Sequence, residues 1–280
     1  MSRSLTLGTW IRIALVAPLV AGAFSSPPVL AAEKKEPAGE KMEKMEKTEN
    51  HGSGRWAYHG DEGPEHWGSL SPSYVACDAG KSQSPIDLRD ADTARMQPIS
   101  FHYRVTPTLL VHNGHTVQGT YKAGSSITIG DQRFDLLQFN FHTPSEHKID
   151  GQAYPMEIHF VHKHQASGRL AVVGVLVAPG DHNLAAQEIW DNLPAQANST
   201  MDKPRVLING RDLLPDNRDY FRYMGSLTKP PCSEGVSWYV LQNPVQFSAA
   251  QIDQIGKLMG YNARPEQHRN HRMVLRASGM

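Results

Sequence analysis

Short runs rich in Val, Ile, Thr, Tyr and Phe recur along the 280-residue chain, separated by Gly, Pro, Asn and Asp. Several of these runs alternate hydrophobic and polar positions, which is the pattern of half-buried β-strands bounded by turns. We therefore predict strands at Leu109–Val111, Thr116–Tyr121, Ser126–Ile129, Arg133–Phe141, Met156–His164, Leu170–Val177 and Ser237–Gln242.

Helical periodicity is clearest in two short segments, Leu184–Leu193 and Ser248–Met259. In the second, Ser248 can act as the N-cap, and Gly260 follows as a stop signal. No linker interrupts the chain from Arg55 onward, and the length of this part suits one domain. We predict a mainly β (α+β) domain over residues 55–280, in which short helices lie around a sheet.

The first 54 residues have a different composition. Arg3 and Arg12 flank the start of the apolar run Ile13–Ala23, and Val29-Leu30-Ala31 offers small residues for cleavage, so we predict a signal peptide over residues 1–31. The run is too short to cross a bilayer, which indicates a periplasmic or secreted protein; an uncleaved amphipathic anchor is the alternative. Residues 32–54, rich in Glu, Lys, Gly and Met, are predicted to be a charged, low-complexity linker.

Charge and cysteine content narrow the partners and the compartment. The 28 basic and 28 acidic residues balance, so the chain has no electrostatic signature for nucleic acid or anionic lipid. We expect a small-molecule partner, no nucleic acid, and a monomer or homodimer. Cys77 and Cys232 are the only cysteines. In an exported protein such a pair is most simply one disulfide, and two free buried thiols are the alternative.

One predicted strand carries three polar residues that can do chemistry. Alternation places Gln138, Asn140 and His142 on one face, while the phenylalanines between them point to the other face. The polar face therefore lies opposite a hydrophobic core.

A second predicted strand presents a matching face. The same alternation groups Glu157, His159 and Val161. On neighbouring antiparallel strands, His142 and His159 would lie about 5 Å apart, close enough to share a zinc ion. Gln138 and Glu157 would sit one step behind and accept the remaining ring N–H groups. Two unrelated core or surface histidines are the alternative.

Further motifs surround these two strands. They are Trp56-Ala57-Tyr58 with Gly63-Pro64 and Trp67, Gln83-Ser84-Pro85-Ile86-Asp87, Asn113-Gly114-His115, Thr143-Pro144-Ser145-Glu146-His147, Met156-Glu157-Ile158-His159-Phe160-Val161-His162 and Gly225-Ser226-Leu227-Thr228-Lys229-Pro230-Pro231-Cys232. Taken together and in this order, they resemble the α-class carbonic anhydrases over almost the whole span from Trp56 to Arg276.

This resemblance implies a large twisted, mostly antiparallel central sheet with a zinc-floored conical pocket, and a Cys77–Cys232 disulfide. It implies an enzyme, a lyase that interconverts carbon dioxide with bicarbonate and a proton. The chemistry needs an apolar pocket beside a strong nucleophile, and zinc supplies the nucleophile because it lowers the pKa of bound water to about 7.

The resemblance also implies residue roles. His142 and His159 would be zinc ligands, with Gln138 and Glu157 as the acceptors behind them. Thr228 would orient the hydroxide on the metal by passing its own proton toward Glu146, and His115 would shuttle protons. The wall that holds carbon dioxide would consist of Val161, Val172, Leu227 and Trp238.

Asn140 departs from the family pattern, which has a third ligand histidine at this position. An amide oxygen is a weaker donor to zinc, so we expect weaker zinc binding and slower catalysis. Alternation argues against rescue by His162 or His164, because both point to the opposite face; His147 lies beyond a turn.

Lys229 is a second departure, at a position usually small or polar. Its cation could attract bicarbonate, disfavour zinc or point to solvent, so the sequence assigns it no role.

Two other functions compete with catalysis of carbon dioxide hydration. Asn140 favours a binding or scaffolding protein that keeps this fold without zinc. A general two-histidine metallohydrolase acting on esters is weaker, because the sequence has no nucleophile elbow and no His-Glu-x-x-His helix.

Overall fold

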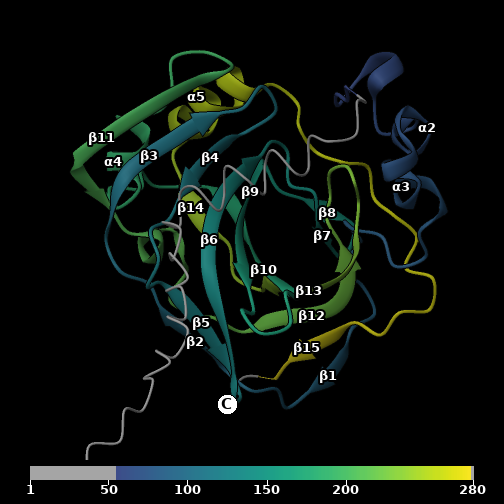
Figure 1. Ribbon diagram of the computed structural model, residues 1–280. Helices are drawn as coiled ribbons and strands as arrows, with labels where there is room; N and C mark the ends of the chain where they lie inside the picture. The colour runs from purple at the N-terminus through teal and green to yellow at the C-terminus, as the bar shows by residue number, and fades with distance from the viewer. Residues whose placement is uncertain (1–54, 279–280) are drawn as a thin grey trace, which may run out of the picture. The chain divides into compact units, whose positions relative to one another are not determined.

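The computed structural model describes residues 55–278, which form one large sheet, a separate two-stranded sheet and short peripheral helices (Figure 1). The predicted signal peptide and linker, residues 1–54, lie outside the described residues. The strands are β1 (Asp92–Ala94), β2 (Ile99–His102), β3 (Thr106–His112), β4 (Val117–Thr120), β5 (Ser126–Ile129), β6 (Gln132–His142), β7 (Lys148–Ile149), β8 (Gln152–Ala153), β9 (Met156–Lys163), β10 (Leu170–Pro179), β11 (Ser199–Ile208), β12 (Tyr220–Ser226), β13 (Glu234–Leu241), β14 (Val245–Phe247) and β15 (Leu275–Ala277). The helices are α2 (Trp67–Leu70), α3 (Ala76–Ala79), α4 (Gln187–Trp190), α5 (Ala249–Met259) and three short 3-10 turns at Gly60–Glu62, Pro72–Tyr74 and Gly210–Leu213.

The main sheet runs in the order β1-β15-β12-β13-β10-β9-β6-β4-β3-β11. Most neighbours are antiparallel; β10 pairs in parallel with β13 and β14, and β1 with β15. The predicted mostly antiparallel sheet is confirmed. Strands β6 and β9 lie side by side at its centre, where neighbouring strands shield both of them.

Every predicted strand is present, with ends that differ by a few residues. The strands that the pattern missed are mainly short or at the edge of the sheet. In β11, most side chains are exposed and Pro204 interrupts the run, so the segment has no buried face to produce alternation.

One of the two predicted helices is confirmed over its length, and the other is confirmed only in part. Helix α5 begins after Ser248, whose side chain forms a capping box with Gln251, and ends at Met259, before the cap residue Gly260. Helix α4 is a single turn within the predicted ten residues. Leu184 is 80% exposed, so the first part of that segment has no apolar contact to hold it helical.

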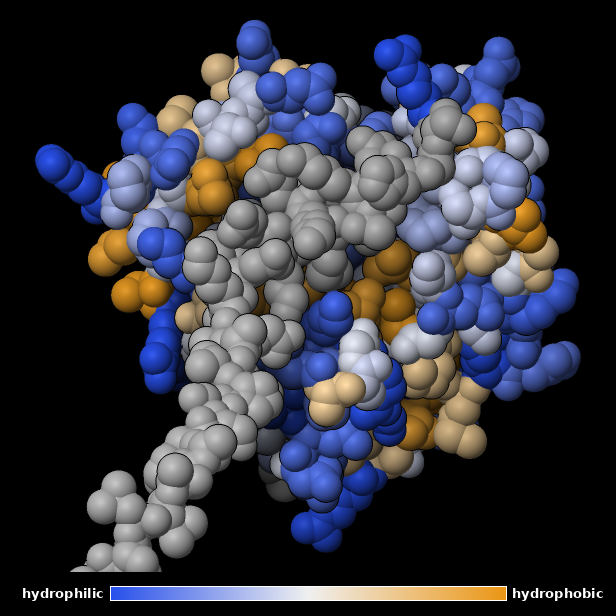
Figure 2. Space-filling model, in the orientation of Figure 1, coloured by the Kyte–Doolittle hydropathy of each residue, from blue (hydrophilic) through white to orange (hydrophobic). Residues whose placement is uncertain are grey.

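Two hydrophobic clusters lie against the sheet. The larger one includes the phenylalanines of β6 and β9, Phe139, Phe141 and Phe160, as the alternation predicts. The smaller one includes Val172 and Trp238, on the side to which the polar residues of β6 and β9 point. In the view of Figure 2, hydrophobic residues are visible at the centre of the face, and hydrophilic side chains project around its edge. Within the described residues, no helix is long and apolar enough to cross a membrane.

Candidate functional site

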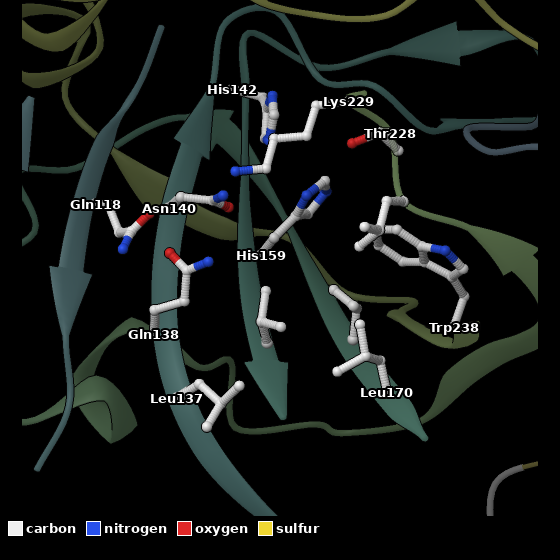
Figure 3. A pocket seen from close by; sticks show the side chains of 13 residues that line it. Gln118, Leu137, Gln138, Asn140, His142, His159, Leu170, Thr228, Lys229 and Trp238 are labelled. Carbon is white, nitrogen blue, oxygen red and sulfur yellow. The ribbon is translucent and has the colours of Figure 1, made fainter. Parts of the chain in front are cut away.

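A pocket opens over the polar face of β6 and β9 (Figure 3). Strands β4, β6, β9, β10 and β13 and the loop after β12 supply its walls. Its lining residues are Gln118, Leu137, Gln138, Asn140, His142, His159, Val161, Leu170, Val172, Leu227, Thr228, Lys229 and Trp238. All four residues expected in the apolar wall are therefore present, next to the two expected histidines.

The strand register decides which polar residues meet. Asn140 lies directly opposite His159, and His142 lies opposite Glu157. The two histidines are thus diagonal neighbours rather than a facing pair, but their ring centroids are only 4.5 Å apart. Both side chains are almost fully buried, at 2% and 3% exposed. They lie close enough to bind one ion.

His142 is held in one tautomer by the backbone. Its Nδ1 lies 2.8 Å from the carbonyl oxygen of Asn262, so Nδ1 carries the hydrogen and the lone pair of Nε2 is free. Burial, followed by the nearby His159, lowers the pKa of His142 to about 3. The ring is therefore neutral at pH 7, as a metal ligand must be.

His159 is positioned by a carboxylate. Its Nε2 lies 2.8 Å from Glu157 Oε1, within ion-pair distance, although the N–H direction departs from hydrogen-bond alignment. Nε2 has no other acceptor, so Glu157 is its partner. Nδ1 then carries the free lone pair. Burial opposes ionisation of the ring, but Glu157 outweighs it and raises the pKa of His159.

Glu157 is itself fixed by a second histidine behind the pocket. Its Oε1 lies 2.8 Å from Nδ1 of His147, and Nε2 of that ring lies 2.7 Å from the hydroxyl of Tyr223. Burial favours the neutral carboxyl, yet the two histidines hold the pKa of Glu157 well below its usual range. Gly174 leaves room for this arrangement, because a Cβ there would lie 2.8 Å from Glu157 Oε1.

Two amide oxygens in the pocket have no hydrogen-bond partner. They are Asn140 Oδ1 and Gln138 Oε1, and both are buried. A buried carbonyl oxygen without a partner is costly, and a bound cation would satisfy Asn140. Two imidazoles and one amide oxygen form a donor set that suits zinc, although the oxygen is a weaker donor than a third imidazole. The residues fit a divalent ion.

Glu146 lies beneath the same two histidines. Its Oε1 accepts a hydrogen bond from the backbone N–H of Arg264 at 2.8 Å, while Oε2 lies 3.6 Å from His142 Nε2 and 3.8 Å from His159 Nδ1. Burial raises the pKa of Glu146 to about 7. The Thr228 hydroxyl is among the groups that lower it, and Oε2 itself has no hydrogen-bond partner.

His115 lies apart from the residues that line the pocket. Its ring stacks on Trp56, with centroids 3.8 Å apart and planes 12° apart. Burial, followed by the charges of Lys229 and His112, lowers the pKa of His115 to about 4. In this position the ring is a weak proton acceptor at neutral pH.

The histidines weighed as replacement ligands lie elsewhere. His162 points to the opposite side of β9, where its Nε2 lies 2.8 Å from the Tyr103 hydroxyl. His164 bonds Ser167, and His147 is bound to Glu157. The alternation of β9 predicted this separation correctly.

Three lining residues were missed by the sequence analysis. Gln118 lies opposite Asn140 on β4, a register that local pattern does not reveal. Leu137 lines the pocket together with its neighbour Gln138, because the pairing of β6 with β9 shifts between Leu136 and Gln138. Leu170, at the start of β10, is the third. Only the irregularity at Leu137 breaks the alternation rule.

Cys77 and Cys232 form a disulfide, as the resemblance implies. The bond joins α3 to the loop that carries Thr228 and Lys229. Figure 3 places the Lys229 side chain inside the pocket, extending toward Asn140 and His142 rather than away from them. The sequence left open whether Lys229 points into the pocket or to solvent, and the structure places it in the pocket.

Comparisons with known proteins agree with this geometry. The model of the family described as eukaryotic-type carbonic anhydrase matches residues 62–278. A carbonic anhydrase of Nostoc sp. is 42% identical over 227 residues, which cover 79% of this chain and 86% of that protein. A carbonic anhydrase of Pectobacterium carotovorum is 40% identical over 221 residues, 79% and 90% of the two chains. The solved complex of the α-carbonic anhydrase of Thermovibrio ammonificans with the inhibitor sulfanilamide has a TM-score of 0.77 and 43% identity, covering 80% of this chain and all of that one.

Proposed function

Since this chain belongs to the eukaryotic-type carbonic anhydrase family, we propose that its pocket binds zinc through His142, His159 and Asn140. The chain is a carbonic anhydrase-type lyase, and its reaction is the reversible hydration of carbon dioxide to bicarbonate and a proton. The observation that carries the zinc proposal is the pair of buried imidazoles, each with one nitrogen engaged and the other free, in one pocket.

Zinc, when bound, would make a water molecule a strong nucleophile at neutral pH. The protein must then hold carbon dioxide and orient the reacting water. Val161, Val172, Leu227 and Trp238 form an apolar surface that suits a small neutral molecule. We assign them the binding of carbon dioxide.

Glu146 and Thr228 would orient the reacting water. Glu146 Oε2 has no hydrogen-bond partner of its own, and the Thr228 hydroxyl, which is among the groups that lower the pKa of Glu146, can donate to this carboxylate. A threonine hydroxyl that donates to this carboxylate presents only lone pairs to the pocket. The reacting water must then donate to Thr228, which directs its own lone pair toward carbon dioxide.

Glu157 is proposed to set the orientation and basicity of His159, a role for which its 2.8 Å contact is the support. Gln138 has lost its counterpart: its Oε1 is unpaired because Asn140 has no second ring nitrogen to donate. We propose that Gln138 positions Asn140 less firmly than it would a histidine.

We assign proton transfer to His115, on the condition that its ring can move away from Trp56. Stacked on Trp56 and with its pKa lowered to about 4, the ring accepts protons poorly at pH 7. The shuttle therefore requires the ring to leave Trp56, which would slow turnover in weak buffer.

We also propose that the protein is exported to a periplasm or secreted. The disulfide supports this assignment, because such bonds persist in oxidising compartments. The apolar run Ile13–Ala23 would serve as the signal peptide.

A second candidate function is favoured by Asn140 alone. A chain with only two imidazoles that did not retain zinc would be a binding protein with this fold. Zinc content separates the two candidates directly.

The proposal is tested with the purified full chain by elemental analysis and stopped-flow carbon dioxide hydration. We expect one zinc per chain and hydration above the buffer rate, with both lost in His142→Ala and His159→Ala. His102→Ala, a substitution of an exposed histidine on β2, is the matched control and should change neither. A folded chain that holds no zinc at micromolar concentrations would support the binding protein instead.

A further inference from the structure

Lys229 lies on a loop whose backbone is held firmly. The loop is closed by hydrogen bonds from Cys232 N to Lys229 O, at 2.9 Å, and from Leu227 N to Ser233 O, at 3.0 Å. The disulfide ties Cys232 to Cys77 on α3. The starting point of the lysine side chain is therefore fixed at the pocket wall.

The side chain enters the pocket without an anionic partner. Figure 3 shows its amine above Asn140 and beside His142. Lys229 is the only lysine or arginine among the lining residues, and that set contains no aspartate or glutamate. Within the described part of the chain, none of the ion pairs includes it. A half-buried ammonium with no counter-ion is a binding site for one.

The rest of the pocket limits which anion fits. One side is the apolar wall of Val161, Val172 and Trp238, which cannot solvate charge. The other side offers the amides of Gln118 and Gln138, which can donate or accept hydrogen bonds. A small oxyanion with one negative charge could reach the ammonium and an amide together.

The two carbon species of the reaction differ most in charge. Carbon dioxide is neutral and apolar, whereas bicarbonate is a monovalent oxyanion. An ammonium interacts strongly with the second and hardly at all with the first, and partial burial strengthens this difference because solvent screens less. The position of Lys229 therefore separates the two ligands by charge.

We propose that Lys229 binds bicarbonate, and small monovalent oxyanions of the same shape, through its ammonium group. The inference rests on the proposed function, in which bicarbonate is formed in this pocket. Lys229 retains bicarbonate longer than the uncharged residue usual at this position would, and it leaves the binding of carbon dioxide almost unchanged. Bicarbonate therefore inhibits hydration at a lower concentration than it would with an uncharged residue at position 229.

The first test measures binding at equilibrium. The dissociation constants of bicarbonate and of formate are measured by calorimetry with the zinc-loaded full chain, at constant pH and ionic strength. Loss of one charge-assisted hydrogen bond in a half-exposed setting predicts roughly tenfold weaker binding in Lys229→Thr and in Lys229→Met. Lys229→Arg, which keeps the charge, should stay within about threefold of the parent.

Lys257→Thr is the matched control, because this lysine is on α5 and its side chain is 82% exposed. It should bind both anions as the parent does. Thermal unfolding of each variant verifies the fold, and Lys229→Arg provides a conservative second variant if threonine disturbs the loop. Parental affinity in both Lys229→Thr and Lys229→Met would overturn the proposal.

A kinetic measurement separates this inference from the proposed function. In Lys229→Thr, the inhibition constant of bicarbonate in the hydration assay should rise by the same factor, with the KM of carbon dioxide changed less than twofold. Anion binding that depends on Lys229 in a chain without hydration activity would uphold the role of Lys229 and refute the proposed function. If the enzyme is active but the inhibition constant of bicarbonate is unchanged in Lys229→Thr, the proposed function stands and the role of Lys229 is refuted.

Discussion

At the scale of single residues, Asn140 is the weakest donor of the three residues that we propose to bind zinc. It lies directly opposite His159 and leaves two buried amide oxygens, its own and that of Gln138, without partners. An imidazole at position 140 would have no amide oxygen, and its second ring nitrogen could donate to the oxygen of Gln138.

Replacement of Asn140 by His should therefore raise zinc affinity and hydration rate together. An added imidazole ligand and a restored partner for Gln138 predict at least tenfold tighter zinc binding, in the range seen for changes around metal ligands. Competition with a chelator measures the affinity, and stopped-flow hydration measures the rate. Asn140→Gln is the control that keeps an amide. Equal zinc affinity in the parent and Asn140→His would show that position 140 does not contact the metal.

At the scale of elements, the loop after β12 brings together groups that the strands do not supply. It carries Leu227, Thr228 and Lys229 into the pocket and is attached to α3 by the disulfide. The pairing of strands β6 and β9 fixes the backbone that carries His142 and His159. The loop has no such ladder, so its precision depends on this cross-link and on hydrogen bonds such as that from Gln83 Nε2 to the Cys232 carbonyl, at 3.1 Å.

Removal of the disulfide should destabilise the protein and weaken the loop. The cysteines are 155 positions apart, and closing a loop of this length contributes up to about 5 kcal/mol on the chain-entropy account. Urea unfolding of Cys77→Ala/Cys232→Ala should show a free energy of unfolding lower by several kcal/mol, and bicarbonate affinity should fall as well. Reductant should lower the stability of the parent but not of the double variant. Parent and variant with the same urea midpoint would contradict this account.

At the scale of the whole molecule, buried histidines make the fold sensitive to acid. His162 lies among the core residues on the side of β9 away from the pocket, with Nδ1 at 3.2 Å from the Ala171 carbonyl and Nε2 at 2.8 Å from the Tyr103 hydroxyl. Burial lowers the pKa of His162 from 6.5 to about 3. Between these values the unfolded chain binds more protons than the folded one, so the free energy of unfolding falls as the pH falls through this window.

His162→Asn should reduce this acid sensitivity. Asparagine can still donate to Ala171 but does not titrate, so the slope of unfolding free energy against pH should fall by about 1.4 kcal/mol per unit between pH 4 and 6. At pH 7 the variant should be less stable by about 1–3 kcal/mol, because the Tyr103 hydroxyl loses its partner. Urea unfolding of parent and variant at pH 7, 6, 5 and 4.5 gives both numbers. Parallel curves would show that His162 does not titrate on unfolding.

The amino-acid sequence by itself determined what depends on neighbours along the chain. Alternation placed Gln138, Asn140 and His142 on one face and separated His159 from His162. These results follow because side chains of a strand alternate whatever the strand pairs with. The capping residues of α5, Ser248 and Gly260, were also predicted correctly from the sequence.

Only the tertiary structure decided what depends on contacts between distant segments. The register of β6 and β9 made Asn140 the partner of His159, an irregular pairing turned Leu137 into the pocket, and strand β4 added Gln118. The direction of Lys229 and the stacking of His115 on Trp56 were set by loops whose conformation has no periodic signal. Register and loop direction are fixed by packing between segments far apart in sequence, and a local pattern carries no information about that packing.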